Sequence, residues 1–141
     1  MADVSLTGGC LCGAVRYTIQ GPAVDTHHCH CGICRKFSGA LFVTVSYFPK
    51  DRVTLTQGTD NLSTYDTSKN VHRRFCKTCG SPVIFEIEGE DVVVLPTGSI
   101  DDGANPGHPP ETVRHTFVKY KVPWYEITDN LPQQAEGTAY E

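Results

Sequence analysis

Hydrophobic side chains recur at every second position along much of the chain, which is the spacing of half-buried β-strands. In residues 43–47, for example, Val43, Val45 and Tyr47 alternate with Thr44 and Ser46. The same alternation, or a short run of β-branched and aromatic residues, predicts further strands at 53–56, 71–75, 83–88, 92–95 and 113–120. Only residues 34–38 favour a short helical turn. The pattern therefore predicts a mainly β chain of short strands.

Turn-forming residues separate these strands at short intervals, since the 141 residues include 13 Gly and 9 Pro. They are densest at 101–112, which is predicted to be a loop. Residues 132–141 are polar and predict a flexible C-terminal tail. Because the length fits one domain, we expect a single domain over residues 1–131 followed by that tail.

Composition and charge narrow the classes of function. The chain is 39% hydrophobic, in the range of a folded globular protein, and 12 Lys and Arg against 16 Asp and Glu give a net charge of -4. Nucleic acids and anionic membrane surfaces usually attract basic proteins, so we expect neither as a partner. No apolar run approaches the roughly 18 residues of a transmembrane helix. The first residues lack the basic and hydrophobic segments of a secretion signal, so a cytoplasmic location is expected.

The seven cysteines are the chemically informative residues, and they fall into three clusters. These are Cys10-Leu-Cys12, Cys29-His-Cys31-Gly-Ile-Cys34 and Cys76-Lys-Thr-Cys79. Disulfides are rare in the cytosol, whereas a tetrahedral thiolate zinc site needs sulfur atoms held close together by tight turns. Gly13, Gly32 and Gly80 each follow a cluster cysteine and are expected to provide the backbone conformation of such turns. The spacing therefore favours metal binding over redox or disulfide chemistry.

The seven cysteines divide into a set of four and a set of three. Cys10, Cys12, Cys76 and Cys79 would close one tetrahedral zinc site, and a closed site is structural. Cys29, Cys31 and Cys34 would leave one coordination position open, as in catalytic zinc sites. A histidine could instead close this second site, with His27, His28, His30 and His72 as candidates. The prediction is thus two zinc ions per chain, the second held with or without a histidine.

Half of the basic residues lie within four positions of a cysteine: Arg16, Arg35, Lys36, Arg73, Arg74 and Lys77. Such residues can offset the negative charge of thiolate–zinc sites or bind an anionic substrate. Lys36 and Arg74 are the candidates for substrate binding. Two large aromatic residues, Tyr17 and Trp124, are predicted to lie in the core.

Three motifs together resemble the glutathione-dependent formaldehyde-activating enzyme family, which also includes centromere protein V. They are Gly9-Cys10-Leu-Cys12-Gly13-Ala-Val-Arg-Tyr17, His28-Cys29-His-Cys31-Gly-Ile-Cys34-Arg-Lys-Phe-Ser38-Gly39 and Arg74-Phe-Cys76-Lys-Thr-Cys79-Gly-Ser-Pro82. The segment FVKYKVPW at 117–124 is also similar, and the resemblance spans about residues 7–128. The order and spacing of the cysteine motifs make it highly specific.

The resemblance implies a β-tent fold, in which small antiparallel sheets are joined by thiolate zinc sites. It also implies that Cys10, Cys12, Cys76 and Cys79 hold a structural zinc, and that Cys29, Cys31 and Cys34 hold the active-site zinc. The family activity is the reversible condensation of formaldehyde with glutathione to S-hydroxymethylglutathione. We therefore expect a zinc-dependent carbon–sulfur lyase that adds glutathione, or a similar thiol, to formaldehyde or another small aldehyde.

Two other functions also fit the sequence. A non-catalytic, zinc-stabilised binding module, as centromere protein V suggests, would need no open coordination position. A thiol redox or metal-sensing protein would form disulfides or hold little metal. In the enzyme, either the thiol is ionised or the aldehyde is polarised, and the sequence is compatible with both. His30 and His72 are candidate proton relays, although a histidine on a strand is more often structural.

Overall fold

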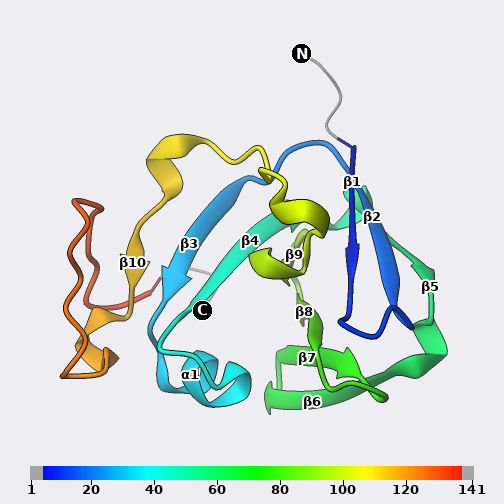
Figure 1. Ribbon diagram of the computed structural model, residues 1–141, viewed down its shortest axis with the longest axis horizontal. Coiled ribbons are helices and arrows are strands. Elements are labelled where there is room, and N and C mark those ends of the chain that lie inside the picture. The colour runs from blue at the N-terminus through cyan, green and yellow to red at the C-terminus, as the bar shows by residue number, and fades with distance from the viewer. Residues whose placement is uncertain (1–4, 138–141) are drawn as a thin grey trace.

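The computed structural model describes residues 5–137, which contain two β-sheets (Figure 1). The smaller sheet has the order β1-β2-β5, with β1 at Ser5–Gly9, β2 at Arg16–Gln20 and β5 at Val53–Gln57. The larger sheet has the order β10-β3-β4-β9-β8-β7-β6. Its strands are β10 (His115–Thr116), β3 (Asp25–Cys29), β4 (Val43–Pro49), β9 (Val92–Pro96), β8 (Pro82–Ile87), β7 (Val71–Cys76) and β6 (Leu62–Ser68).

Helical structure is limited to short pieces. The α-helix α1 (Gly32–Ser38) follows β3 and includes the turn predicted at 34–38. The 3₁₀ turns are η1 (Lys50–Arg52), η2 (Thr59–Asn61), η3 (Thr97–Ser99), η4 (Asp101–Gly103), η5 (Pro110–Thr112) and η6 (Val118–Tyr120). Neighbouring strands are antiparallel, apart from the parallel pair β10–β3. The predicted fold class, mainly β with antiparallel sheets, is confirmed.

Five of the six predicted strands are present, as β4, β5, β7, β8 and β9. Four further strands, β1, β2, β3 and β6, were not predicted. β1 ends in two glycines, β3 reads Asp-Thr-His-His-Cys, and β6 is polar along most of its length, so hydrophobic periodicity detects none of them. β2 does alternate, with Tyr17 and Ile19 buried, and could have been found.

The strand predicted at 113–120 is wrong. Only His115 and Thr116 pair as β10, because Phe117 adopts a left-handed φ of 57° that an extended strand cannot contain. The backbone N–H groups of Phe117 and Val118 donate to the carbonyls of Glu136 (3.2 Å) and Gln134 (3.0 Å). Part of the predicted tail thus runs beside this segment, and residues 138–141 lie outside the described residues.

The hydrophobic core has two parts on opposite faces of the larger sheet. The larger part lies between the sheets and contains Tyr17 and Phe48, together with Cys10 and Cys76. The smaller part contains Val45, Tyr47, Phe85 and Val94, with Phe37 of α1 packed against it. Tyr47 and Phe48 are adjacent in β4 and point to opposite faces, so both faces of the sheet are hydrophobic.

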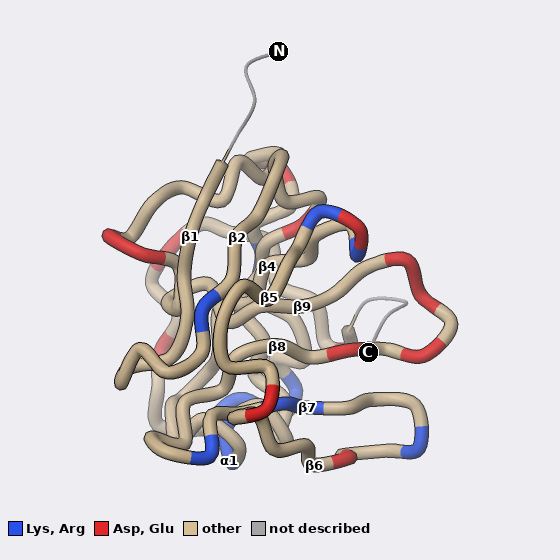
Figure 2. The backbone as a smooth tube through the Cα atoms, turned by 90° about the vertical axis from the view of Figure 1, so that its right-hand side faces the viewer, with Lys and Arg blue, Asp and Glu red and all other residues tan. Residues whose placement is uncertain are grey.

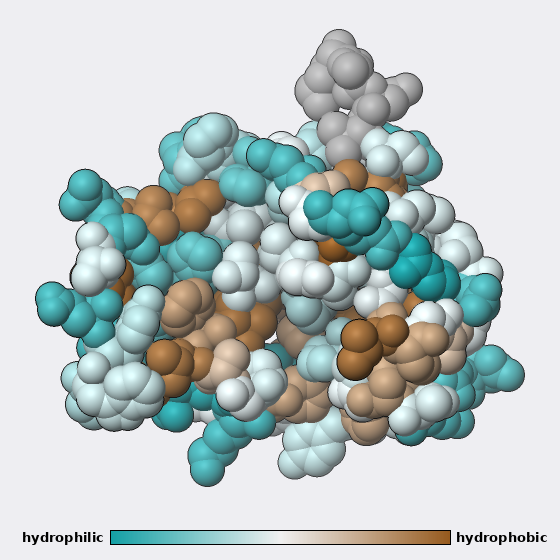
Figure 3. All heavy atoms as spheres, in the orientation of Figure 1, coloured by the Kyte–Doolittle hydropathy of each residue, from teal (hydrophilic) through white to brown (hydrophobic). Residues whose placement is uncertain are grey.

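The two aromatic predictions for the core have different outcomes. Tyr17 is buried, at 1% exposure, and its hydroxyl bonds to Ser99 Oγ at 2.7 Å. Trp124 is 75% exposed, so its assignment to the core is wrong. It follows η6 in a segment with little regular structure, where no strand or helix places it against the sheets. Other hydrophobic side chains also reach the surface, and Figure 3 shows hydrophobic patches between hydrophilic ones.

Charged residues lie mostly on turns and strand ends. In Figure 2, acidic and basic residues are interspersed over the turns that connect the strands. Within residues 5–137, no helix has the length and apolar character required to cross a membrane.

Candidate metal centres and cavity

The fold brings the seven cysteines together as two groups. Cys10, Cys12, Cys76 and Cys79 form one group, and Cys29, Cys31 and Cys34 form the other. Within each group all sulfur atoms lie within 4.8 Å of one another. This is the same division into four and three that the sequence spacing suggested.

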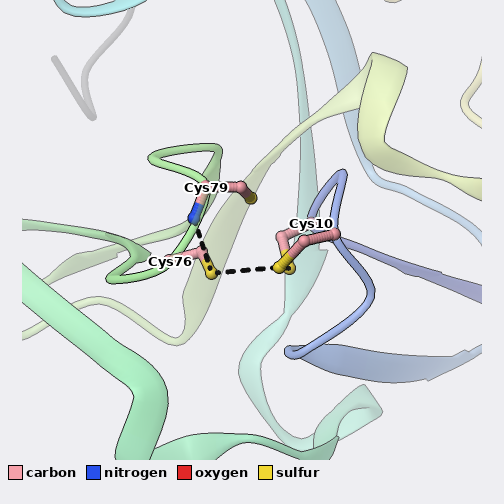
Figure 4. A group of neighbouring side chains, drawn as sticks. Cys10, Cys76 and Cys79 are labelled. Carbon is pink, nitrogen blue, oxygen red and sulfur yellow. Dashed lines mark hydrogen bonds between the residues drawn. The ribbon is translucent and has the colours of Figure 1, made fainter.

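The four-cysteine group joins two turns that are distant in the sequence. Cys10 and Cys12 lie in the turn after β1, and Cys76 and Cys79 lie at the end of β7 and in the turn that follows. The Sγ atom of Cys12 is 3.7 Å from both Cys10 Sγ and Cys76 Sγ. Figure 4 shows the side chains of Cys10, Cys76 and Cys79 extending from these two turns toward one another.

Hydrogen bonds to sulfur hold the second of these turns. The backbone N–H groups of Thr78 and Cys79 donate to Cys76 Sγ, at 3.3 and 3.5 Å, and Asn61 Nδ2 donates to the same atom at 3.3 Å. A hydrogen bond from the Ser81 hydroxyl is the main cause that lowers the pKa of Cys79 to about 5. The turn therefore favours thiolates, the form in which cysteine binds metal. Asn61 was not singled out in the sequence, because only the fold places η2 beside this turn.

The predicted glycine turns are present in two of three cases. Gly80 has φ 79° and donates its N–H to the Cys76 carbonyl at 2.8 Å, and Gly13 has φ 82° and donates to the Cys10 carbonyl at 3.1 Å. Gly32 does not have a positive φ, so the same role predicted for it is wrong. It is the first residue of α1, and Cys31 is the N-cap, whose sulfur accepts a hydrogen bond from the Cys34 N–H at 3.3 Å.

The three-cysteine group lies where β3 passes into α1. Cys29 is the last residue of β3, and Cys31 and Cys34 lie at the start of α1. Contact with the thiols of Cys29 and Cys34 lowers the pKa of Cys31 to about 2, and the positive charge of Arg73 acts in the same direction. The contacts with Cys31 and Cys34 raise the pKa of Cys29.

No candidate histidine joins either group among the described residues. His27 lies 3.3 Å from Asp25, His28 bonds to Thr44 at 2.8 Å, and His72 bonds to Asp66 and Glu88 at 2.6 and 2.7 Å. The positions therefore favour a second site with three protein ligands over one closed by histidine.

His30 belongs to a hydrogen-bonded series of side chains that the sequence did not suggest, with His30 and His115 buried and Asp129 exposed. Its Nε2 lies 2.8 Å from His115 Nδ1, and His115 Nε2 lies 3.0 Å from a carboxylate oxygen of Asp129. Burial lowers the pKa of His30 to about 4, so the ring is neutral near pH 7. These hydrogen bonds between side chains link the segment that carries Cys29 and Cys31 to β10 and to Asp129.

A cavity of about 690 Å³ adjoins the three-cysteine group. Its lining includes Cys29, Cys31 and Cys34, as well as Lys36 and Arg73. Arg74, predicted to bind substrate together with Lys36, does not line the cavity and pairs instead with Glu86 at 3.4 Å. Neither His30 nor His72, the candidate proton relays, is among the lining residues.

Both groups fit zinc by donor chemistry and spacing. Four thiolates at about 2.3 Å from zinc in a tetrahedron place their sulfur atoms ~3.8 Å apart, and the Cys10–Cys12 and Cys12–Cys76 sulfur separations are 3.7 Å. Sulfur-rich donor sets select zinc among the common divalent ions of proteins. The four-cysteine group would complete a tetrahedron, whereas the three-cysteine group would leave one coordination position open.

A model of the glutathione-dependent formaldehyde-activating enzyme family matches residues 5–120. Proteins of Aspergillus flavus and Aspergillus oryzae are each 34% identical to this chain over 91 residues, and one of Podospora anserina is 36% identical over 91 residues. All three carry provisional names as glutathione-dependent formaldehyde-activating enzymes. The matches cover 61% of this chain and 48%, 48% and 43% of the relatives, so the chain spans about half the length of the curated relatives it matches.

Among solved structures, the crystal structure of a Rhodobacter sphaeroides protein superposes with a TM-score of 0.59 at 22% identity. The superposition covers 72% of this chain and 92% of that one. At this identity the likeness concerns the fold alone.

Proposed function

Because the chain belongs to the glutathione-dependent formaldehyde-activating enzyme family, we propose that it is a zinc-dependent carbon–sulfur lyase that reversibly adds a thiol to formaldehyde or another small aldehyde. The observation that carries the proposal is the unequal placement of the two thiol groups. Cys29, Cys31 and Cys34 line the cavity, whereas the other four cysteines do not, and Cys10 and Cys76 belong to the core. A ligand in the cavity could therefore reach Cys29, Cys31 and Cys34.

The two groups have different roles in this proposal. Cys10, Cys12, Cys76 and Cys79 hold a structural zinc that ties the turn after β1 to the turn after β7. Cys29, Cys31 and Cys34 hold the second zinc beside the cavity. A zinc ion held by three thiolates acts as a Lewis acid, which favours ionisation of a thiol and polarisation of a carbonyl.

The reaction forms one carbon–sulfur bond. The sulfur of the thiol attacks the aldehyde carbon, the carbonyl π bond breaks, and the proton lost by the thiol ends on the oxygen of the hydroxymethyl product. Lys36 and Arg73 place positive charge on the cavity wall, which favours the ionised thiol and the oxygen on which negative charge develops. The hydrophobic lining excludes water and strengthens both effects.

The other two functions predict different behaviour. All seven cysteines are free, and their sulfur atoms gather in groups of four and three rather than in pairs, which favours metal ligation over a disulfide-based redox role. A binding module would need no access to the three-cysteine group. The cavity at that group therefore favours the enzyme.

The experiment is exchange NMR of formaldehyde with several thiols, glutathione among them, with and without zinc-loaded protein at the same pH. We expect exchange above the uncatalysed rate, which must be measured in a matched blank because that reaction is itself fast. Lys36→Met should slow the exchange, whereas Lys50→Met, which changes an exposed lysine outside the cavity, should not. Identical rates with and without protein across several thiols and aldehydes would favour the binding module.

A further inference from the structure

The cavity beside Cys29, Cys31 and Cys34 has a hydrophobic wall. Its floor is the second hydrophobic face of the larger sheet, formed by Val45, Tyr47, Val71, Phe85, Ile87 and Val94. Phe117 and Tyr120 complete the lining from the segment after β10. Lys36 and Arg73 are the charged side chains among the lining residues, apart from the thiols, and none of the described lining residues is acidic.

The size of the cavity indicates a ligand much larger than formaldehyde. A volume of about 690 Å³ lies within the range of ~300–1,000 Å³ that is usual for sites of drug-sized molecules. Formaldehyde has a single carbon atom and would occupy a small part of it. Most of the space is therefore available to the body of the other substrate, the thiol.

The charges of the cavity match those of glutathione only in part, since glutathione has two carboxylates and an ammonium group. Lys36 and Arg73 could face the carboxylates, but no described lining residue is acidic and could face the ammonium group. The Arg73 guanidinium already stacks on Phe85, with its central carbon 4.6 Å from the ring centroid, and its Nε donates to Thr67 Oγ1 at 3.3 Å. With no acidic group among the described lining residues, an ammonium group would have no carboxylate partner there. Ionised groups placed against a hydrophobic wall without partners lose hydration that nothing replaces.

The aromatic part of the cavity lining, Phe117 and Tyr120, is held in place by specific backbone contacts. Phe117 has a left-handed φ of 57°, which bulky residues rarely adopt. Its N–H bonds to the Glu136 carbonyl and the next N–H bonds to the Gln134 carbonyl, so the 134–136 segment supports this conformation. The Phe117 and Tyr120 rings lie 6.3 Å apart between centroids. The fold thus maintains an aromatic surface at the cavity.

We propose that the thiol substrate of this site has a hydrophobic body, such as an alkyl or aryl group, rather than the charged peptide body of glutathione. Its sulfur lies at the Cys29–Cys31–Cys34 end, and its body packs on the face that carries Val94 and Phe85. This inference rests on the proposed function for the identity of the reacting group, and on the cavity lining for the character of the body.

The test is a calorimetric titration of the zinc-loaded full chain with ethanethiol, butanethiol, hexanethiol and glutathione, which gives the Kd of each thiol. Burial of each added methylene should lower Kd by about twofold to fourfold, since a fully buried methylene contributes ~0.8 kcal/mol. Hexanethiol should therefore bind more than tenfold more tightly than ethanethiol, and more tightly than glutathione. Equal Kd values along the alkyl series, or tighter binding of glutathione than of hexanethiol, would overturn the proposal.

Two adjacent residues of β9 provide a matched pair of variants. Val94 lines the cavity, whereas Val93 belongs to the core on the opposite face, and both are buried, at 4% and 3% exposure. Val94→Thr should raise the Kd of hexanethiol at least threefold with little effect on ethanethiol, and Val93→Thr should change neither. Thermal melts establish whether each variant is folded. If Val94→Thr is not folded, Val71→Thr replaces it as the cavity variant, because Val71 is a half-buried lining residue. An equal effect of Val93→Thr and the cavity variant would contradict the assigned binding face.

Thiol affinity and thiol–formaldehyde exchange, measured on the same zinc-loaded protein, separate this inference from the proposed function. If affinity rises with alkyl length but no thiol exchanges faster with formaldehyde, the cavity has the proposed ligand class and the lyase proposal fails. If exchange is accelerated while affinity is independent of alkyl length, the lyase proposal stands and the hydrophobic-body proposal fails.

Discussion

At the scale of single residues, the two thiol groups differ in their surroundings. In the four-cysteine group, Cys10 and Cys76 are 6% and 0% exposed and pack within the core between the sheets, whereas Cys12 is exposed and Cys79 is half-buried. Cys31 is half-buried and faces the cavity. Loss of a ligand should therefore have different consequences at the two sites.

Cys79→Ala should leave the chain poorly folded or insoluble. Structural zinc in small domains can contribute ~10 kcal/mol or more, and a typical domain has ~5–15 kcal/mol of net stability. The group that loses a ligand also joins turns more than 60 residues apart in the chain, as the contact between Cys12 and Cys76 shows. Thermal melts and soluble yield measure the effect.

Cys31→Ala should remain folded, with loss of about one zinc ion per chain and of the accelerated thiol–formaldehyde exchange. The reason is that Cys29, Cys31 and Cys34 belong to one local loop, so this site constrains little of the chain. Elemental analysis measures the zinc content of the variant, and thermal melts show whether it is folded. Unfolding of Cys31→Ala alongside a folded, active Cys79→Ala would mean that the two roles are reversed.

The two carboxylate partners of His72 predict a pH-dependent contribution of this residue to the stability of the fold. Its hydrogen bond to Asp66, and then that to Glu88, raise the pKa of His72 above 6.5 in the folded protein. A histidine with a higher pKa in the folded than in the unfolded protein stabilises the folded state. The stabilisation is complete at pH values below the pKa of the unfolded state, and it is lost as the pH rises through the pKa of the folded state. His72→Gln should therefore destabilise the protein more at about pH 5.5 than at about pH 8.5. Denaturant melts at the two pH values check this, and an effect that grows with pH would contradict it.

At the scale of elements, short turns position the sulfur atoms, and η2 supports the turn after β7. Asn61 is the last residue of η2, and its carbonyl accepts the Lys77 N–H at 2.9 Å. Its side-chain Nδ2 donates to Cys76 Sγ and to Thr78 Oγ1. One side chain thus orients both a ligand and the turn that carries it.

Asn61→Ala should weaken zinc retention at the four-cysteine site by about tenfold, because loss of a partner to a metal ligand typically costs ~10–100-fold in metal affinity. Competition with a chromogenic chelator measures it. Asn105→Ala is the matched control, since Asn105 accepts a hydrogen bond from Gly107 in an exposed loop without contact to a cysteine. Equal zinc affinity in the two variants would argue against a role for Asn61.

At the scale of the whole molecule, the larger sheet separates two environments. One face packs against the smaller sheet around the four-cysteine group, and the other carries the cavity beside the three-cysteine group. The arrangement places one metal centre between the turns after β1 and β7, where Cys12 reaches the surface, and the other at the cavity. Gradual removal of metal should therefore affect the two centres in sequence.

A chelator should remove the two zinc ions in two phases. The first phase should empty the site beside the cavity with little change in circular dichroism, because its ligands are local and one position is open. The second should coincide with loss of the β-sheet signal, because the remaining site joins two distant turns. A chromogenic chelator and circular dichroism recorded together check the order, and loss of sheet signal in the first phase would contradict it.

The sequence by itself determined what depends on local spacing and periodicity. Alternation identified the strands that are hydrophobic on one face or both, and each cysteine motif identified sulfur atoms that lie close together, because they are a few residues apart in a tight turn. The contact of the Cys10–Cys12 turn with the Cys76–Cys79 turn joins distant segments and depends on the tertiary structure. The tertiary structure alone decided what depends on contacts between distant segments. It exposed Trp124, placed Asn61 on a ligand, directed Arg73 rather than Arg74 to the cavity, and set a hydrophobic wall beside the three thiols. The choice between Arg73 and Arg74 depends on strand register, because a shift of one residue would exchange the faces that they occupy. The positions of Trp124 and Asn61 depend on how the segments between strands lie against the sheets.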